Sequence, residues 1–315
     1  MRFLVSLLLL CATTAVAQSY PTRAVRVLVG FPPGGGTDIM ARFLAPKLAE
    51  YLGQPFVVEN RPGATTNIAS DMVAKSAPDG HTLLFTTSAL AINMSLYKNL
   101  TFDALKDFAP VSVFADSPNL LVAHQSAGAS VKELLAKARA KPDSMNYSSA
   151  GAGTSQHLAG ELFKARTGVQ IQHIPYKGTA ASLTAVIAGE VQFSFANVPA
   201  ILGHVRSGRI HALAVLADKR SALMPDVPTM KEAGVDGVVV PVWYALLAPA
   251  ATPREIVKAL GDATARAARA TDLNQKLIEQ GAEPVGNTPE EFSKLLREEV
   301  TRWAEVVRVS GAKAE

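Results

Sequence analysis

The fold of this chain is decided by the stretch Val25-Arg-Val-Leu-Val-Gly-Phe-Pro-Pro-Gly-Gly-Gly-Thr-Asp-Ile-Met-Ala-Arg-Phe-Leu-Ala45. Valine alternates with other side chains up to Val29, which predicts a short β-strand. Residues 32–36, Pro-Pro-Gly-Gly-Gly, end that strand, and Thr37-Asp38 predicts the N-cap of a helix. A strand, a glycine-rich loop and a helix N-terminus present unpaired backbone N–H groups at the positive end of a helix dipole. This unit is either a plain strand–helix connection or an anion site.

The loop does not match the known phosphate-binding motifs. A P-loop ends in Gly-Lys-Ser/Thr, whereas Gly36 is followed here by Thr37 and Asp38. A carboxylate is the better candidate for the anion, because Asp38 would repel a phosphate from the same helix end.

The same plan of strand, polar turn and helix repeats along the first part of the chain. Residues 55–59 predict a strand whose following turn leads through residues 64–67 into a helix, and residues 81–87 predict a third strand ending in Thr-Thr-Ser. Such units predict a parallel sheet with helices on both faces. Ligands of open sheets bind beyond the carboxyl ends of the strands.

A second half of the chain repeats this logic. After two predicted strands at 108–114 and 119–124, strands at 145–149, 169–174 and 189–195 alternate with helices. The tail from Pro253 is helical, and we expect it to return and cover the first sheet. The prediction is therefore two α/β lobes joined by two crossings, with a ligand cleft between them.

The composition of the chain limits which classes of partner we expect. Its 315 residues suffice for two domains, and its formal net charge is +4. Basic residues are scattered without a basic stripe, which excludes nucleic acid as an expected partner. The histidines show no metal-ligand spacing, so we expect neither a metal nor a cofactor.

Residues 1–17 predict a cleaved secretory signal peptide. Arg2 precedes the apolar run 3–10, and residues 15–17, Ala-Val-Ala, form a small-x-small cleavage site. The apolar run is shorter than a membrane span of about 20 residues, so no membrane insertion of the mature chain is expected. Cys11 lies inside this leader, which leaves a mature chain without cysteine. Export without disulfides is typical of a periplasmic protein.

Several motifs in order resemble the tripartite tricarboxylate transporter substrate-binding receptors, also called the Bug family. The resemblance covers essentially the whole mature chain. The motifs are Phe31-Pro-Pro-Gly-Gly-Gly-Thr-Asp38, Glu59-Asn-Arg-Pro-Gly-Ala64, Pro78-Asp-Gly80, Tyr147-Ser-Ser-Ala-Gly151, His157-Leu158, Pro175-Tyr-Lys-Gly178, Leu213-Ala-Val215, Pro225-Asp-Val-Pro-Thr229 and Trp243-Tyr244.

This resemblance implies a type II periplasmic-binding-protein-like clamp, in which each α/β lobe is a mainly parallel sheet flanked by helices. Residues 18–122 with 226–315 would form domain 1, and residues 123–225 would form domain 2. The protein would be a monomer that captures a small carboxylate, a di- or tricarboxylate or an aromatic acid. It would deliver this ligand to a two-subunit membrane permease.

The resemblance also implies a set of ligand contacts at the cleft. The expected ligand-binding residues are Pro33, Gly35, Thr37, Ala64, Thr65, Thr87, Ser88, Gly153, Thr154, His157, Tyr176 and Asn197. Many relatives carry an acid after the strand at 189–195, where this chain has Ala196 followed by Asn197. That departure argues against an amino-acid ligand.

Some alternatives stay open at this point. His157 either faces the cleft or caps its helix, and Lys177 either meets a ligand charge or is a solvated turn residue. The chain carries no Gly-x-Ser-x-Gly elbow and no metal signature, so an exported hydrolase is disfavoured. A receptor that presents its ligand to a signalling partner is the remaining alternative class.

Overall fold

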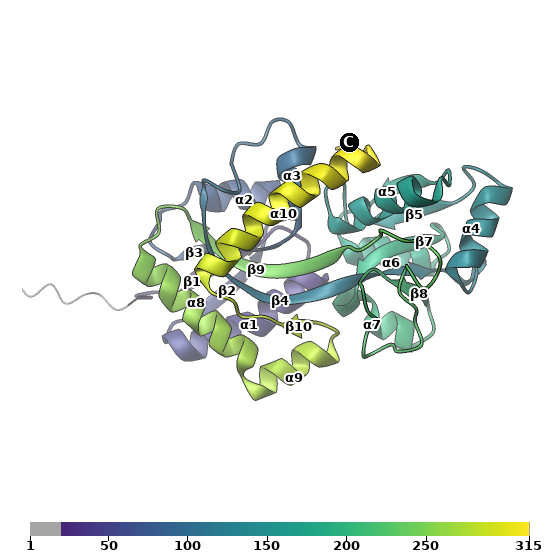
Figure 1. Ribbon diagram of the computed structural model, residues 1–315. Helices are drawn as coiled ribbons and strands as arrows, with labels where there is room; N and C mark the ends of the chain where they lie inside the picture. The colour runs from purple at the N-terminus through teal and green to yellow at the C-terminus, as the bar shows by residue number, and fades with distance from the viewer. Residues whose placement is uncertain (1–19, 315) are drawn as a thin grey trace, which may run out of the picture.

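The computed structural model describes residues 20–314, and Figure 1 shows two α/β lobes lying side by side. The first lobe opens with three strand–helix units. Its elements are β1 (Val25–Val29), α1 (Gly36–Leu52), β2 (Phe56–Asn60), α2 (Asn67–Ala74), β3 (Thr82–Thr87) and α3 (Ala89–Leu96). β1 pairs in parallel with both β2 and β3. This confirms the parallel sheet predicted from the three successive strand–helix units.

The second lobe repeats the strand–helix alternation. Its elements are a 3₁₀ turn (Gln125–Ala127), α4 (Val131–Ala140), β5 (Asn146–Ser149), α5 (Ser155–Thr167), β6 (Gln172–Pro175), α6 (Thr179–Ile187), β7 (Phe193–Asn197), α7 (Val198–Arg206) and β8 (His211–Val215). β5 lies between β6 and β7 and is parallel to both.

Two long strands, β4 (Phe108–Ala123) and β9 (Pro241–Pro249), lie side by side at the junction of the lobes, and β4 pairs with strands of both sheets. The strand order is β2-β1-β3-β9-β4-β7-β5-β6, with β8 and β10 also paired to β4. β4 pairs with β9 as far as Pro118 and with β7 from Asn119 onward. The prediction of two strands at 108–114 and 119–124 was wrong, because β9 and β10 hold the intervening residues in an extended conformation. The predicted domain boundaries stay a prediction.

The C-terminal part returns to the first lobe, as predicted. It comprises α8 (Arg254–Arg269), α9 (Thr271–Glu279), β10 (Glu283–Pro284) and α10 (Pro289–Ser310). α8 packs on α1 and β4, whereas α10 packs on α3, β4 and also α5 of the second lobe. The long α10 helix, yellow in Figure 1, therefore bridges the two lobes.

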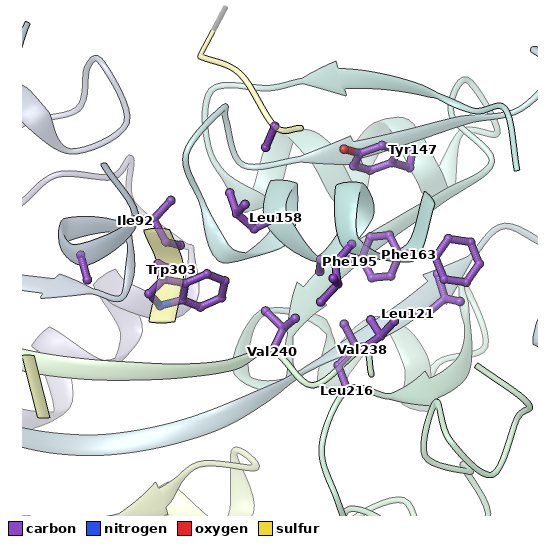
Figure 2. Close-up of a cluster of buried hydrophobic side chains, with 14 of the residues drawn as sticks. Ile92, Leu121, Tyr147, Leu158, Phe163, Phe195, Leu216, Val238, Val240 and Trp303 are labelled. Atoms are coloured by element: carbon purple, nitrogen blue, oxygen red, sulfur yellow. The ribbon is translucent and has the colours of Figure 1, made fainter. Parts of the chain in front are cut away.

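Trp303 of α10 sits in a buried apolar cluster that draws on both lobes. The cluster includes Ile92 of α3 and Leu158 of α5, and Figure 2 shows these side chains around the indole. Glu299, 5% exposed, accepts hydrogen bonds from the Nε1 atoms of Trp303 (2.9 Å) and Trp243 on β9 (3.0 Å). This carboxylate ties β9 to the bridging helix.

Within residues 20–314, every helix is too short or too polar to cross a membrane. The same part of the chain brings no three His, Cys, Asp or Glu side chains together in a way that could hold a metal ion. The predicted signal peptide lies outside the described residues.

Candidate functional site

A small polar cavity lies between the two lobes, and its wall comes from the loops that the sequence analysis singled out. Its volume is about 30 Å³. The residues that line it are Phe31, Pro32, Pro33, Gly35, Gly36, Thr37, Thr87, Ala150, Thr154, Ser155, Gln156, Lys177, Gly178, Thr179, Ala180, Asn197 and Val242. Lys177 is the one ionisable side chain in this lining.

Helix N-termini from both lobes converge on this cavity. The first turns of α1, α5 and α6 contribute directly to the wall, and Thr87 and Asn197 lie at the starts of α3 and α7. The first N–H groups of a helix have no partner within the helix, and its dipole is positive at that end. The cavity wall is therefore rich in donors and electropositive, which suits an anion.

The α1 helix begins earlier than predicted. Its N-cap is Gly35 rather than Thr37-Asp38, because the side chain of Asp38 folds back to accept a hydrogen bond from the Gly34 N–H at 3.0 Å. Arg42 and Asn60 also donate to this carboxylate, at 3.0 and 2.9 Å. Burial alone would raise the pKa of Asp38, but these hydrogen bonds outweigh it and hold the pKa below its usual value. The charge of Asp38 is thus paired behind the loop, and Thr37 is left facing the cavity.

Glycines allow the two lobes to approach closely at the cavity. A Cβ at Gly36 would overlap the Oδ1 of Asn197 on the second lobe and come within 2.9 Å of the Tyr244 hydroxyl on β9. A Cβ at Gly178 of the second lobe would lie 3.1 Å from the ring of Pro32 on the first. Any larger residue at Gly36 would require the Asn197 and Tyr244 side chains to move.

Thr154 has a structural role at this site. Its hydroxyl accepts a hydrogen bond from the His157 N–H at 3.2 Å and donates to the Gly151 carbonyl at 2.7 Å, so it caps α5. By contrast, Thr37 is 5% exposed and no hydrogen bond in the described residues involves its hydroxyl group. Thr37 is therefore the more available of these two donors.

Six of the predicted contacts line the cavity: Pro33, Gly35, Thr37, Thr87, Thr154 and Asn197. The other six, Ala64, Thr65, Ser88, Gly153, His157 and Tyr176, lie outside its lining. Ligand contacts by all twelve stay a prediction.

Ala64 and Thr65 form a left-handed turn beside the cavity. Ala64, Thr65 and Thr66 have φ angles of 43°, 48° and 74°, a conformation that costs L-residues roughly 1–2 kcal/mol each. Asn93 of α3 holds the turn by donating to the Thr65 carbonyl at 2.8 Å. Tyr97, which directly follows α3, donates across to the Ala152 carbonyl at 3.1 Å, so this region contacts the second lobe directly.

His157 lies beneath the cavity wall. Its ring stacks on His173 with 4.3 Å between centroids, and its Nδ1 accepts a hydrogen bond from the Gly153 N–H at 3.2 Å. Burial lowers the pKa of His157 to about 4 and that of His173 to about 3, the latter with help from the neighbouring imidazole. We call these two residues the histidine stack. Both rings are neutral at pH 7 and support the loop before α5.

The remaining predicted residues also lie behind or beside the wall. Ser88 is fully buried at the start of α3. Gly153 packs against Asn93 so closely that a Cβ would overlap the Oδ1 atom. Tyr176 precedes Lys177 and is half-buried.

Sequence reasoning missed Gln156 and Thr179 and left Lys177 open. Thr179 directly follows the Pro-Tyr-Lys-Gly turn and begins α6. Applying the helix N-terminus argument to that turn would have found Thr179. Gln156 carried no signal, because its role depends on contacts between separate elements.

Two α/β lobes that meet at β4, with an electropositive cavity between them, define a periplasmic-binding-protein-like solute receptor. Residues 40–311 match the family described as the tripartite tricarboxylate transporter family receptor. This chain belongs to that family.

Relatives of known structure or name agree with this assignment. Protein BugT of Bordetella pertussis is 40% identical over 305 residues, covering 96% of this chain and 94% of that protein. The structure of Rpa4515 of R. palustris with adipate is 38% identical with a TM-score of 0.91, covering 94% of this chain and 100% of that one. MatC from Rhodopseudomonas palustris with bound malate is 33% identical with a TM-score of 0.87, covering 91% and 100%. Because the matching family is one of receptors, the hydrolase alternative falls away.

Proposed function

We propose that this protein is a periplasmic receptor that captures a small carboxylate by lobe closure and delivers it to a tripartite tricarboxylate transporter permease. The observation that carries the proposal is the convergence of helix N-termini from both lobes on one cavity. Its lining contains one cation, Lys177, and no acidic side chain among the described residues. Helix N-termini of this kind favour bound anions. The adipate and malate bound by the two relatives are both dicarboxylates.

The mechanism follows from the origin of the cavity wall. The wall comes from both lobes, so a ligand held there contacts both of them, and the lobes separate for it to enter and leave. Contacts across the cavity, such as Tyr97 to the Ala152 carbonyl, are made only while the lobes are together. A ligand held from both sides stabilises the closed form and shifts the population toward it.

A thermal-shift screen of residues 18–315 tests the binding proposal. The panel contains dicarboxylates, tricarboxylates, aromatic acids and amino acids. A ligand that binds only the folded protein raises the free energy of unfolding, and with it the melting temperature. At a ligand concentration of a hundred times Kd, the free energy of unfolding rises by about 2.7 kcal/mol. We expect a shift with one class of carboxylate. No shift with any acid, from protein refolded to remove bound ligand, would contradict the proposal.

Replacing Thr37 with Val tests the location of the binding site. Loss of a buried donor to an anion costs about 1.5–3 kcal/mol, so the affinity should fall at least about tenfold. The matched control is Thr301→Val, because Thr301 lies exposed on α10 and donates to the Arg297 carbonyl. Equal affinities of both variants by calorimetry would remove Thr37 from the site.

Delivery to a permease is a separate claim with its own test. Deleting the gene should abolish uptake of the radiolabelled carboxylate that gives the thermal shift. Binding with unchanged uptake would instead favour the sensing alternative.

A further inference from the structure

Tyr97 makes a contact between the lobes that lies outside the cavity. It directly follows α3 of the first lobe, and its hydroxyl donates to the Ala152 carbonyl of the second lobe at 3.1 Å. Tyr97 and Ala152 both lie outside the lining of the cavity. The same hydroxyl is 3.4 Å from the Oγ1 atom of Thr65 in the first lobe. The tyrosine proton therefore has one acceptor in each lobe, and the shorter hydrogen bond joins the two lobes.

The first lobe holds an unfavourable backbone conformation against this contact. Thr65 has a φ angle of 48°, and its Oγ1 atom lies 3.1 Å from where a Cβ of Gly151 in the second lobe would be. Asn93, which is fully buried, donates to the Thr65 carbonyl at 2.8 Å and to Oδ1 of Asn67 at 2.7 Å. Strained backbone persists only where its surroundings fix it. The turn is thus held in place facing the second lobe.

The loop of the second lobe presents a buried carbonyl to Tyr97. The Gly153 N–H donates to Nδ1 of His157 at 3.2 Å, which fixes the loop from within its own lobe. Ala152 is 8% exposed, and within residues 20–314 its carbonyl accepts no other hydrogen bond. A buried carbonyl without a partner costs free energy. The Tyr97 hydroxyl removes that cost while the lobes are together, and water can do so once they separate.

The contribution of this hydrogen bond does not depend on the ligand. Both of its partners are protein groups, so it favours the closed form with any ligand and with none. The apparent affinity of a receptor is reduced by the fraction of the protein that is not in the binding-competent form. Weakening the bond between Tyr97 and Ala152 should therefore raise the Kd of every ligand by the same factor.

We propose that Tyr97 and the Ala152 carbonyl form a latch that sets how much of the protein is closed, so that Tyr97 scales the affinity for all ligands by a common factor and leaves selectivity unchanged. Tyr97 is a positioning residue, because it acts on the ligand through the position of the second lobe. This inference rests on the proposed capture of a ligand by lobe closure.

Calorimetry of Tyr97→Phe with several acids tests the latch. The probes are adipate, L-malate, succinate and citrate, and each one that binds the wild type is compared. Phenylalanine keeps the ring and removes the donor to Ala152. We expect the Kd of each acid to rise at least about fivefold, which corresponds to about 1 kcal/mol, with the ratios between acids within twofold of the wild-type ratios. A purely structural defect would lower the fraction of protein that binds without changing Kd.

The matched control is Tyr51→Phe. Tyr51 is also half-buried, but it lies on α1 with its ring 3.9 Å from the guanidinium carbon of Arg266, outside the cavity lining. This variant should bind with wild-type affinity. Equal Kd values for Tyr97→Phe and the wild type overturn the latch and leave the receptor function standing. A change in Kd that differs more than twofold between acids also overturns it. No binding of any acid by the wild type overturns the receptor function and the latch together.

Gly153→Ala tests the latch from the second lobe and keeps the proposal falsifiable if Tyr97→Phe does not fold. A Cβ at Gly153 would lie 3.1 Å from Cε2 of Tyr97 and would overlap Oδ1 of Asn93, so it pushes the loop away from the tyrosine. We expect the Kd values of all bound acids to rise by one common factor. Unchanged Kd values, or ratios between acids that change more than twofold, overturn the inference.

Discussion

Glu299 joins β9 to the bridging helix α10, and its removal has a calculable cost. Oε2 of this carboxylate accepts both buried indole N–H groups, from Trp243 at 3.0 Å and Trp303 at 2.9 Å. Oε1 accepts from Arg302 at 2.7 Å. Glu299→Ala orphans two buried donors, each costing about 1–3 kcal/mol. We therefore expect a loss of roughly 2–6 kcal/mol in the free energy of unfolding.

Glu299→Gln is the informative comparison. Its amide oxygen can still accept from both indoles, and the partly exposed Arg302 can turn to solvent, so the loss should be about 1 kcal/mol. At about 2–4 °C per kcal/mol for a chain of this size, Glu299→Ala should melt roughly 4–24 °C below the wild type.

Scanning calorimetry of both variants measures these losses. The control is Glu305→Ala, which removes an exposed ion pair with Arg308 on the same helix and should leave the melting temperature unchanged. If Glu299→Ala melts no lower than Glu299→Gln, the indole hydrogen bonds do not hold β9 to α10.

Three further predictions concern the turns and loops around the cavity. Ala64→Gly relieves a positive φ angle of 43° and should raise the free energy of unfolding by up to about 1 kcal/mol. The control, Ala136→Gly at an exposed position of helix α4, should lower the free energy of unfolding by a similar amount. If urea denaturation shows both substitutions changing the free energy of unfolding in the same direction, the strain argument is wrong. Gly153→Ala should weaken carboxylate binding at least tenfold, because the added Cβ would overlap Asn93 of the facing lobe. The control is Gly168→Ala, because Gly168 has a similar φ angle and no atom lies near its Cβ position; this variant should bind with wild-type affinity in calorimetry. In the folded protein, the pKa values of His157 and His173 are about 4 and about 3, so below about pH 6.5 the unfolded chain binds protons that the folded protein does not. The free energy of unfolding should therefore fall by a few kcal/mol from pH 7 to pH 4. If the urea midpoint of His157→Gln falls as steeply with pH as that of the wild type, other groups cause the loss of stability.

The local strand–helix units could be predicted from the sequence because each has a local cause. The alternation ending at Val29 and the glycines at 34–36 specify β1 and the turn before α1 without help from distant residues. Thr154 likewise caps α5 through its own hydroxyl.

Features that depend on contacts between distant elements could not be predicted in this way. The continuity of β4 comes from its pairing with β9 and β10, far along the chain. Asp38 turned away from its expected capping position because Arg42 and Asn60 pair with it. His157 lies on α5, whereas its stacking partner His173 comes from β6, so local sequence could not predict the histidine stack.

The central claim is that a carboxylate lies between the lobes, held by helix N-termini from both sides. A crystal structure of residues 18–315 with the acid that gives the largest thermal shift tests this claim most directly. We expect the carboxylate oxygens within hydrogen-bond distance of the first-turn N–H groups of α1 and of α5 or α6, between Thr37 and Thr179. An acid bound to one lobe alone, or outside the cavity that these residues line, would contradict the account.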